Sequence, residues 1–215
     1  MAHRAGFVNI IGNPNVGKST LMNALVGERL SIITSKAQTT RHRIMGIVNG
    51  EDFQIVYSDT PGILKPAYKL QESMMNFVQG AVDDADVILY VTDTVEQSDR
   101  SESIVEKINR SGIPAIVVIN KIDLTTPDKL EALASEWSAK MPQAVIIPVS
   151  AKEKVGMAGV LAAILERLPE GEAFYPKDTL TDKTLRFFAS EIIREKILLN
   201  YDKEIPYCCE IEIDS

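Results

Sequence analysis

A run of residues near the start of the chain has the types and the spacing of a phosphate-binding loop. Gly12, Gly17, Lys18 and Ser19 fit the pattern G-x-x-x-x-G-K-[ST], between a strand-like run and a helix-like run. Glycines let successive backbone N–H groups surround a phosphate, and a helix N-terminus adds partial positive charge. Lys18 would then reach the β- and γ-phosphate oxygens, and the Ser19 hydroxyl would bind Mg²⁺. The alternative is an ordinary Gly/Asn/Pro turn between the two elements.

A second motif, Asp59-Thr60-Pro61-Gly62, follows a strand-like run. An acidic residue at the end of a strand can hold Mg²⁺ through water. The glycine can offer its N–H to a γ-phosphate and move when that phosphate leaves. The same four residues also make a favourable β-turn, so the position of the motif after the phosphate-binding loop supports the nucleotide interpretation.

A third motif, Asn120-Lys121-Ile122-Asp123, indicates which nucleotide is bound. The Asp123 carboxylate can accept hydrogen bonds from N1–H and the exocyclic amine of guanine, whereas adenine would leave it unpaired. Asn120 can support the loop or the purine edge, and the stem of Lys121 can cover the ring face. The backbone N–H groups of residues 150–152 can reach guanine O6. The alternative is a polar loop that closes a strand; the guanine interpretation predicts GTP and opposes an ATPase or a kinase.

These motifs require a scaffold that brings several loops to one edge. Strands are predicted at 7–11, 44–48, 53–57, 87–91, 115–119 and 144–149, and helices at 18–26, 68–82, 101–110, 127–141 and 156–168. Asn49-Gly50 predicts a hairpin between the second and third strands. The predicted fold class is α/β: a three-layer P-loop fold with a six-stranded, mostly parallel sheet, one antiparallel strand and helices on both faces.

The pattern changes after the last of these helices. We predict a nucleotide-binding domain at 1–170, a linker at 171–183 and the start of a second domain at 184–215. That last part has apolar residues at helical spacing from Leu185 and an alternating, strand-like run at 207–213. One helix and one strand cannot enclose a core, so we expect the chain to be a truncated part of a longer protein.

The composition is that of an ordinary globular protein, with 45% hydrophobic and 25% charged residues. The net charge of −7 argues against a broadly basic nucleic-acid surface, and we expect no DNA partner. No apolar run has the ~20 residues of a membrane span, and the start of the chain lacks the layout of a signal peptide. Cys208 and Cys209 are adjacent and form no disulfide framework. We therefore expect a cytoplasmic protein.

Two further segments carry a family resemblance. The string KAQTTRHR at residues 36–43 resembles the first switch of the bacterial Era-type GTPases, within the TrmE-Era-EngA-like group. The string FFASEIIREK at residues 187–196 closely resembles the helix that opens their C-terminal KH domain. The order of the nucleotide motifs is that of translation-factor-related GTPases, so the resemblance covers essentially the whole chain.

The resemblance has implications for the site. It implies that a switch threonine joins the Mg²⁺ shell, with Thr40 as the first choice and Thr39 as the second. It implies that Asn15 helps to bind K⁺, although an Asn that merely favours the turn is an equal alternative. It also implies slow intrinsic hydrolysis, because Ile63 stands where many GTPases have a water-orienting glutamine.

The resemblance also implies partners. Era-type proteins bind the 3′ end of 16S rRNA through the KH domain and act in small ribosomal subunit assembly, and they can associate peripherally with the inner membrane. The linker near 171–176 would then report the nucleotide state to the KH domain. However, residues 181–215 contain no G-x-x-G loop of the KH type, so rRNA contacts would fall to a later part of the protein. The alternative function is a GTP-binding interaction module with negligible hydrolysis.

The complete set of predicted site residues is as follows. The predicted catalytic residues are Lys18, Thr40 and Gly62. The predicted Mg²⁺ ligands are Ser19, Thr40 and Asp59, with Asn15 for K⁺. The residues predicted to bind GTP or GDP are Gly12, Asn13, Pro14, Asn15, Val16, Gly17, Lys18, Ser19, Thr20, Asp59, Thr60, Pro61, Gly62, Ile63, Asn120, Lys121, Asp123, Ser150, Ala151 and Lys152.

Overall fold

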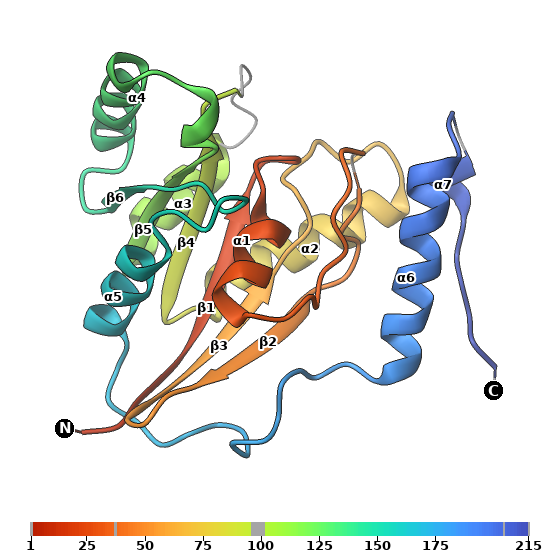
Figure 1. Ribbon diagram of the computed structural model, residues 1–215. Coiled ribbons are helices and arrows are strands. Elements are labelled where there is room, and N and C mark those ends of the chain that lie inside the picture. The colour runs from red at the N-terminus through yellow and green to blue at the C-terminus, as the bar shows by residue number, and fades with distance from the viewer. Residues whose placement is uncertain (1, 37, 96–101, 204, 215) are drawn as a thin grey trace.

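The computed structural model describes residues 2–36, 38–95, 102–203 and 205–214 (Figure 1). Ala37 of the predicted switch, the predicted helix start at Ser101 and the chain ends Met1 and Ser215 lie outside the described residues. None of the described helices is long and apolar enough to cross a membrane.

Six strands form one sheet, in the order β2-β3-β1-β4-β5-β6. They are β1 (Arg4–Gly12), β2 (Ile44–Asn49), β3 (Phe53–Asp59), β4 (Val87–Asp93), β5 (Ala115–Asn120) and β6 (Val145–Pro148). Only the β2–β3 hairpin pair is antiparallel among these strands, and the other neighbours run parallel. The predicted six-stranded α/β sheet with one antiparallel strand is therefore confirmed.

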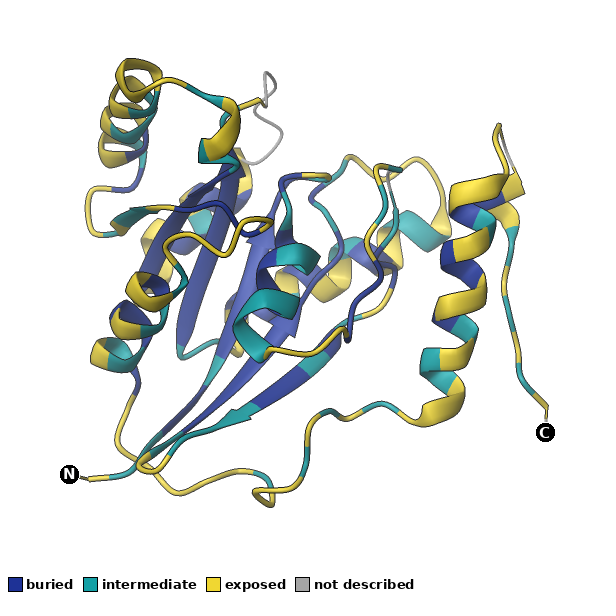
Figure 2. Ribbon diagram, viewed as in Figure 1, coloured by how far each residue is buried: buried dark blue, intermediate teal, exposed yellow. Residues whose placement is uncertain are grey.

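Helices cover both faces of the sheet. They are α1 (Lys18–Val26), α2 (Lys69–Asp83), α3 (Glu102–Ser111), α4 (Pro127–Lys140), α5 (Met157–Arg167), α6 (Leu185–Asn200) and α7 (Ile205–Cys208), with a 3₁₀ turn at η1 (Ile122–Leu124). Helices α1 and α5 pack on one face and α2, α3 and α4 on the other, each over its own hydrophobic core. In Figure 2 the central strands are coloured mostly as buried.

The apolar runs in the sequence explain this two-sided burial. In β4, Leu89 belongs to the core under α1 and α5, whereas Ile88 and Tyr90 belong to the core under α2, α3 and α4. Successive residues of a strand point to opposite faces, so a strand buried on both sides must be apolar at nearly every position. The carboxyl ends of the parallel strands meet at one edge, and the predicted motifs follow those ends.

The linker is fixed along the open edge of the sheet. The backbone N–H of Ile47 in β2 donates to the carbonyl of Leu180 at 2.8 Å, and the Thr181 hydroxyl donates to the carbonyl of Met45 at 2.6 Å. Further back, the Gln54 carboxamide oxygen accepts the backbone N–H of Tyr175 at 3.0 Å. This strap satisfies polar groups of an edge strand that would otherwise be free to pair with other chains.

The chain after the linker differs from the prediction. Helix α6 begins at Leu185 as predicted and extends to Asn200. The strand predicted at 207–213 is wrong: residues 205–208 form α7, and the described residues after it form no strand. A strand needs a neighbour for its hydrogen bonds, and here two carbonyls of the predicted strand, those of Tyr207 and Cys209, are instead bound by Arg41.

Candidate nucleotide-binding site

The loop at residues 12–19, between β1 and α1, has the geometry that its glycines predict. Gly17 has a φ of 96°, and a Cβ at this position would lie 2.2 Å from Nδ2 of Asn120. Only glycine combines this left-handed backbone with such a close approach. The Lys18 side chain is 6% exposed, and its Nζ donates to the carbonyl of Asn13 at 2.8 Å. The lysine is thus folded back over the loop that would hold a phosphate.

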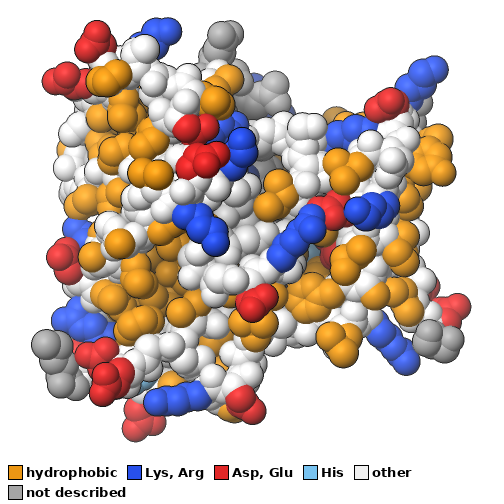
Figure 3. Space-filling view, in the orientation of Figure 1, with side chains coloured by type: hydrophobic (Ala, Val, Ile, Leu, Met, Phe, Trp, Pro, Cys, Tyr) orange, Lys and Arg blue, Asp and Glu red, His pale blue; other side chains and the backbone are white. Residues whose placement is uncertain are grey.

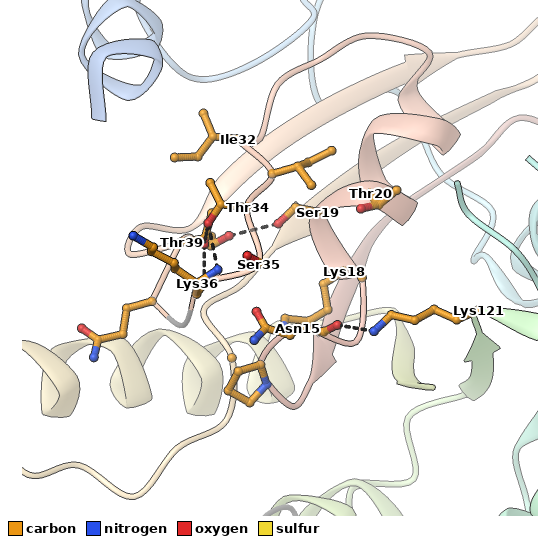
Figure 4. Close-up of a pocket in the computed structure, with 16 residues that line it drawn as sticks. Asn15, Lys18, Ser19, Thr20, Ile32, Thr34, Ser35, Lys36, Thr39 and Lys121 are labelled. Atoms are coloured by element: carbon orange, nitrogen blue, oxygen red, sulfur yellow. Dashed lines mark hydrogen bonds between the residues drawn. The ribbon is translucent and has the colours of Figure 1, made fainter. Parts of the chain in front are cut away.

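A pocket of about 450 Å³ lies between this loop and residues 32–36 and 38–43, which we call the switch loop (Figure 4). Its lining residues are Pro14, Asn15, 17–20, 32–36, 38–40, Gly62 and Lys121. Figure 4 shows Asn15 and Lys18 on one side of this space and Thr34, Lys36 and Thr39 on the other. The volume suits a small-molecule ligand, and the lining combines the first two predicted motifs with the switch loop.

Three predicted Mg²⁺ ligands meet at the edge of this pocket. The Ser19 hydroxyl donates to Oδ2 of Asp59 at 2.7 Å and lies 3.0 Å from Oγ1 of Thr40. The Thr40 hydroxyl donates to the same carboxylate oxygen at 3.4 Å. These side chains come from α1, β3 and the switch loop, far apart in the sequence.

The Asp59 carboxyl is fully buried, and its Oδ1 has no hydrogen-bond partner among the described residues. Burial raises the pKa of Asp59, while the Ser19 hydrogen bond and the Lys18 charge oppose this rise. A buried carboxylate oxygen beside two hydroxyls fits a hard cation with oxygen ligands, such as Mg²⁺. Thr39 is directed elsewhere, because its hydroxyl bonds the hydroxyl of Thr34 and the carbonyl of Lys36.

The Asn120 side chain joins the predicted guanine loops to the phosphate loop. Asn120 donates from Nδ2 to the carbonyl of Val16 at 2.8 Å and accepts the Ala151 N–H at Oδ1 at 3.0 Å. It therefore holds three loops in a fixed arrangement. Asp123 is exposed, and its Oδ1 accepts the Ser150 hydroxyl at 2.5 Å. The Ser150 hydrogen bond therefore orients the Asp123 carboxylate, which remains accessible to a ligand.

Lys121 has a left-handed backbone, with a φ of 62°, and its side chain returns toward the phosphate loop. Its Nζ donates to the carbonyl of Asn15 at 2.7 Å and pairs with the buried Asp93. Asp93 was not among the predicted residues. It stands at the carboxyl end of β4, the strand beside β1 and β5, and this position is the signal that would have indicated it.

Two predicted nucleotide-binding side chains face the interior instead. The Thr60 hydroxyl donates to the carbonyl of Ile10 at 2.7 Å, and Ile63 is 2% exposed within the core under α2. A nucleotide would therefore meet these two residues through their backbone. Lys152 is exposed and lies 3.6 Å from the carboxylate of Glu153, so only its backbone fits the predicted role.

The switch loop also contacts the tail, formed by α6 and α7, and this contact was not predicted. Arg194 of α6 donates to the carbonyl of Thr39 and makes a two-point pair with Glu191. Glu195 accepts the backbone N–H of Ile33 at 3.2 Å and pairs with Arg29. One side of α6 thus binds the segment that carries Thr40.

Arg41 extends the same interface to α7. Its guanidinium donates to the carbonyls of Pro206 at 3.0 Å, Tyr207 at 3.0 Å and Cys209 at 2.7 Å. Burial and the nearby Arg194 lower the pKa of Arg41 from its ordinary value. The short helix α7 and the residue after it are therefore held by Arg41, which directly follows Thr40 in the switch loop.

Comparisons with known proteins agree with this geometry. The sequence profile of the family described as "50S ribosome-binding GTPase" matches residues 7–121. The chain is 44% identical over 218 residues to the chloroplastic ERA-like GTPase of Oryza sativa subsp. japonica, covering 99% of this chain and 51% of the relative. It is 40% identical over 211 residues to GTPase Era of Clostridium perfringens, covering 98% of this chain and 71% of the relative. The chain spans about half the length of the rice relative.

Two solved structures have the same fold at similar sequence identity. A crystal structure of Era with MgGDPNP and nucleotides 1506–1542 of 16S ribosomal RNA has a TM-score of 0.91 and 41% identity, over 95% of this chain and 70% of that one. A variant of Aquifex aeolicus Era bound to GDP·AlF₄⁻ has a TM-score of 0.89 and 41% identity, over 94% and 70% of the two chains. With the family profile, the near-complete matches and the shared fold, this chain belongs to the Era family of GTPases.

Proposed function

We propose that this chain binds GTP with Mg²⁺ and hydrolyses it to GDP and phosphate as a molecular switch. The observation that carries the proposal is the cluster of Ser19, Thr40 and Asp59 beside the phosphate-binding loop. The related Era structures contain MgGDPNP or GDP·AlF₄⁻, which supports the same class of ligand here.

The predicted phosphate and metal residues have positions that support their roles. Lys18 would exchange its bond to the Asn13 carbonyl for phosphate oxygens, and the Gly62 N–H would bind the γ-phosphate. Ser19, Thr40 and Asp59 would hold Mg²⁺, which when bound neutralises phosphate charge. Thr40 is preferred to Thr39 because only Thr40 faces Asp59.

The K⁺ assignment stays a prediction. Asn15 lines the pocket, as a K⁺ ligand would, but its φ of 65° equally suits a turn residue. Comparing nucleotide turnover in K⁺ and Na⁺ separates the two interpretations.

Asp123 would select guanine. Its carboxylate is exposed at the carboxyl edge of the sheet, with Ser150 bound to one oxygen. An ATPase or a kinase would gain nothing from a carboxylate here, since adenine offers it no pair of donors. Competition between GTP and ATP for the chain tests this choice: equal affinities would refute the guanine site.

The tail contacts supply a route by which the nucleotide state reaches the rest of the protein. The sequence suggested that the linker carries this signal, but the linker lies along β2, away from the pocket. The Arg194–Thr39 and Arg41–tail hydrogen bonds join α6 and α7 directly to the switch loop. A loop that moves with the γ-phosphate would therefore move these helices.

A role in small ribosomal subunit assembly, through 16S rRNA and a KH domain that begins at residue 184, is the proposed output. It is supported by the related Era structure with 16S ribosomal RNA. On the face shown in Figure 3, Lys and Arg side chains are interspersed with Asp and Glu, so this face has no extended basic surface for RNA. The rRNA contacts would then belong to the remaining part of the protein. A cytoplasmic location and peripheral membrane association stay predictions.

One observation favours the second candidate, a GTP-binding interaction module with negligible hydrolysis. The residue after the D-x-x-G motif is Ile63, which has no polar side-chain atom and lies in the core. Phosphate release from GTP in a single turnover distinguishes the two candidates, because a pure binding module would bind GTP and release no phosphate.

A further inference from the structure

The proposed hydrolysis requires a group that orients the attacking water. Many GTPases use a glutamine that follows the D-x-x-G motif. Here that residue is Ile63, 2% exposed, whose backbone N–H donates to the carbonyl of Gly12 at 3.1 Å. The isoleucine side chain has no polar atom in any rotamer, so it cannot present a polar group to the pocket.

The required position of the water follows from the reaction geometry. The attacking oxygen forms a bond to the γ-phosphorus as the bond between that phosphorus and the GDP oxygen breaks, so the two oxygens are in line. The phosphate-binding loop lies on the GDP side. The water must therefore lie on the opposite side, against the wall formed by Gly62 and the switch loop.

Gln38 is a polar residue of this wall, and its partners suit the task. It lines the pocket with Thr39, Thr40 and Gly62. Its carboxamide oxygen accepts the Tyr68 hydroxyl at 2.8 Å, and its Nε2 has no partner among the described residues. Tyr68 directly precedes α2, in the segment after Gly62, so this hydrogen bond joins the two nucleotide-sensing segments.

Apart from Ser35, the other polar side chains of the wall are already engaged. Thr34 and Thr39 bond each other, Thr40 bonds Asp59, and the Lys36 ammonium bonds the carbonyl of Tyr201 and the carboxylate of Asp202. A carboxamide has both a donor and an acceptor, which is what holding a water in one orientation requires.

The backbone at Gln38 is held in an uncommon conformation. Its φ of 60° is left-handed, which costs energy in a residue other than glycine and persists only where the surroundings enforce it. Such positions concentrate at functional sites. The Thr39 hydroxyl donates to the carbonyl of Lys36 at 2.6 Å across this turn, and the Tyr68 hydrogen bond holds the Gln38 side chain.

We propose that Gln38 orients the attacking water, in place of the glutamine that Ile63 replaces, and that Tyr68 is the positioning residue that holds the Gln38 amide. The inference rests on the proposed GTP hydrolysis. A carboxamide is too weakly basic to take the proton of the water. The proton therefore passes to an oxygen of the γ-phosphate, which is released as inorganic phosphate, and Gln38 serves only to align the water oxygen.

The test uses the full chain with Mg²⁺ and compares three quantities: the single-turnover hydrolysis rate, the affinity for GDPNP, and the affinity for GDP with aluminium fluoride. Gln38→Ala should slow hydrolysis about tenfold or more and weaken GDP–aluminium fluoride binding by a similar factor. GDPNP affinity should stay within about twofold, because the ground state does not use the aligned water. Gln38→Gly, which removes the amide and suits the left-handed backbone, should behave likewise.

Tyr68→Phe should slow hydrolysis about threefold with GDPNP affinity unchanged, since the amide remains and only its tether is lost. The matched control is Gln79→Ala, an exposed glutamine near the end of α2, which should hydrolyse at the wild-type rate. Wild-type hydrolysis in both Gln38 variants, or a loss of GDPNP affinity equal to the loss of rate, would overturn the inference. A wild-type chain that releases no phosphate would instead overturn the proposed function on which the inference rests.

Discussion

Arg194 of α6 donates a hydrogen bond to the backbone carbonyl of Thr39, the residue directly before Thr40. The same guanidinium is paired with Glu191 and is 4% exposed, so it is a fixed and buried contact. Because Thr40 faces Ser19 and Asp59, one residue links the helix of the tail to the proposed metal site. The nucleotide pocket and the tail therefore share a single loop.

The first prediction concerns this link. Arg194→Gln removes the charged donor to Thr39, and GDPNP should then dissociate about tenfold faster in the presence of Mg²⁺, since the loop closing the pocket loses an anchor worth roughly 1.4 kcal/mol. Stopped-flow release of a fluorescent GDPNP measures this rate. Arg110→Gln is the matched control, because Arg110 forms only an exposed pair with Glu106. Equal release from both variants would show that the Arg194 contact does not hold the switch loop.

The second prediction concerns Asp59. Asp59→Asn should weaken Mg²⁺ binding to the GDPNP complex by about 10- to 100-fold, because a charged ligand becomes neutral. The Tm should stay equal or rise, since burial raises the pKa of this carboxyl and the amide avoids that desolvation cost. Mg²⁺ titration and calorimetry measure the two effects. Asp52→Asn, in the exposed hairpin, serves as the control, and an unchanged Mg²⁺ affinity at Asp59→Asn would remove this residue from the metal site.

The third prediction concerns base selection. Asp123→Asn should weaken GTP binding by about 100-fold and improve the binding of xanthosine triphosphate, whose C2 oxygen can accept from the new amide. Competition with labelled GDP measures both affinities. Asp128→Asn, in the exposed first turn of α4, should leave them unchanged. Retained preference for GTP in the Asp123 variant would contradict the assignment.

The fourth prediction concerns His42 at the interface with α6, where its ring packs edge-on against Phe187 at 6.0 Å between centroids. Burial lowers the pKa of His42 below 6.5; Glu191 opposes this shift, whereas Arg194, Lys183 and Arg41 add to it. The folded state therefore binds fewer protons than the unfolded state. The stability that neutral His42 contributes is present above 6.5 and is lost as the pH falls through the folded pKa.

His42→Gln should accordingly flatten the fall in Tm between about pH 7 and about pH 5, measured by differential scanning calorimetry. His3→Gln, at the other histidine of the chain, is the control. An identical pH dependence in the wild type and the His42 variant would show that this ring does not report on the interface.

The nucleotide-binding domain was predictable because its signals are local. The loop around Lys18 and the loop around Asp123 each follow a continuous apolar run, and such runs predict strands whose carboxyl ends meet. Asp59 could be placed for the same reason. The family resemblance favoured Thr40 over Thr39, but the residues alone do not separate the two, since adjacent residues of an irregular loop have no periodicity that predicts the direction of their side chains.

The contacts of the tail were not predictable, because they depend on pairings distant in the sequence. Nothing in the sequence near Arg194 indicates that it donates to the carbonyl of Thr39, and nothing near Arg41 indicates that it donates to the carbonyl of Pro206. The strand predicted at 207–213 failed for a related reason. Alternation describes which faces a strand would bury, but a strand forms only where a neighbour accepts its hydrogen bonds.

The most direct test of the account is a single-turnover measurement of phosphate release from γ-labelled GTP by the wild-type chain and by Lys18→Ala, with Mg²⁺ and with EDTA. The account predicts that the wild type releases phosphate only with Mg²⁺, and that Lys18→Ala neither binds GTP tightly nor releases phosphate. Phosphate release by Lys18→Ala at the wild-type rate, or none from a wild type saturated with GTP and Mg²⁺, would contradict it.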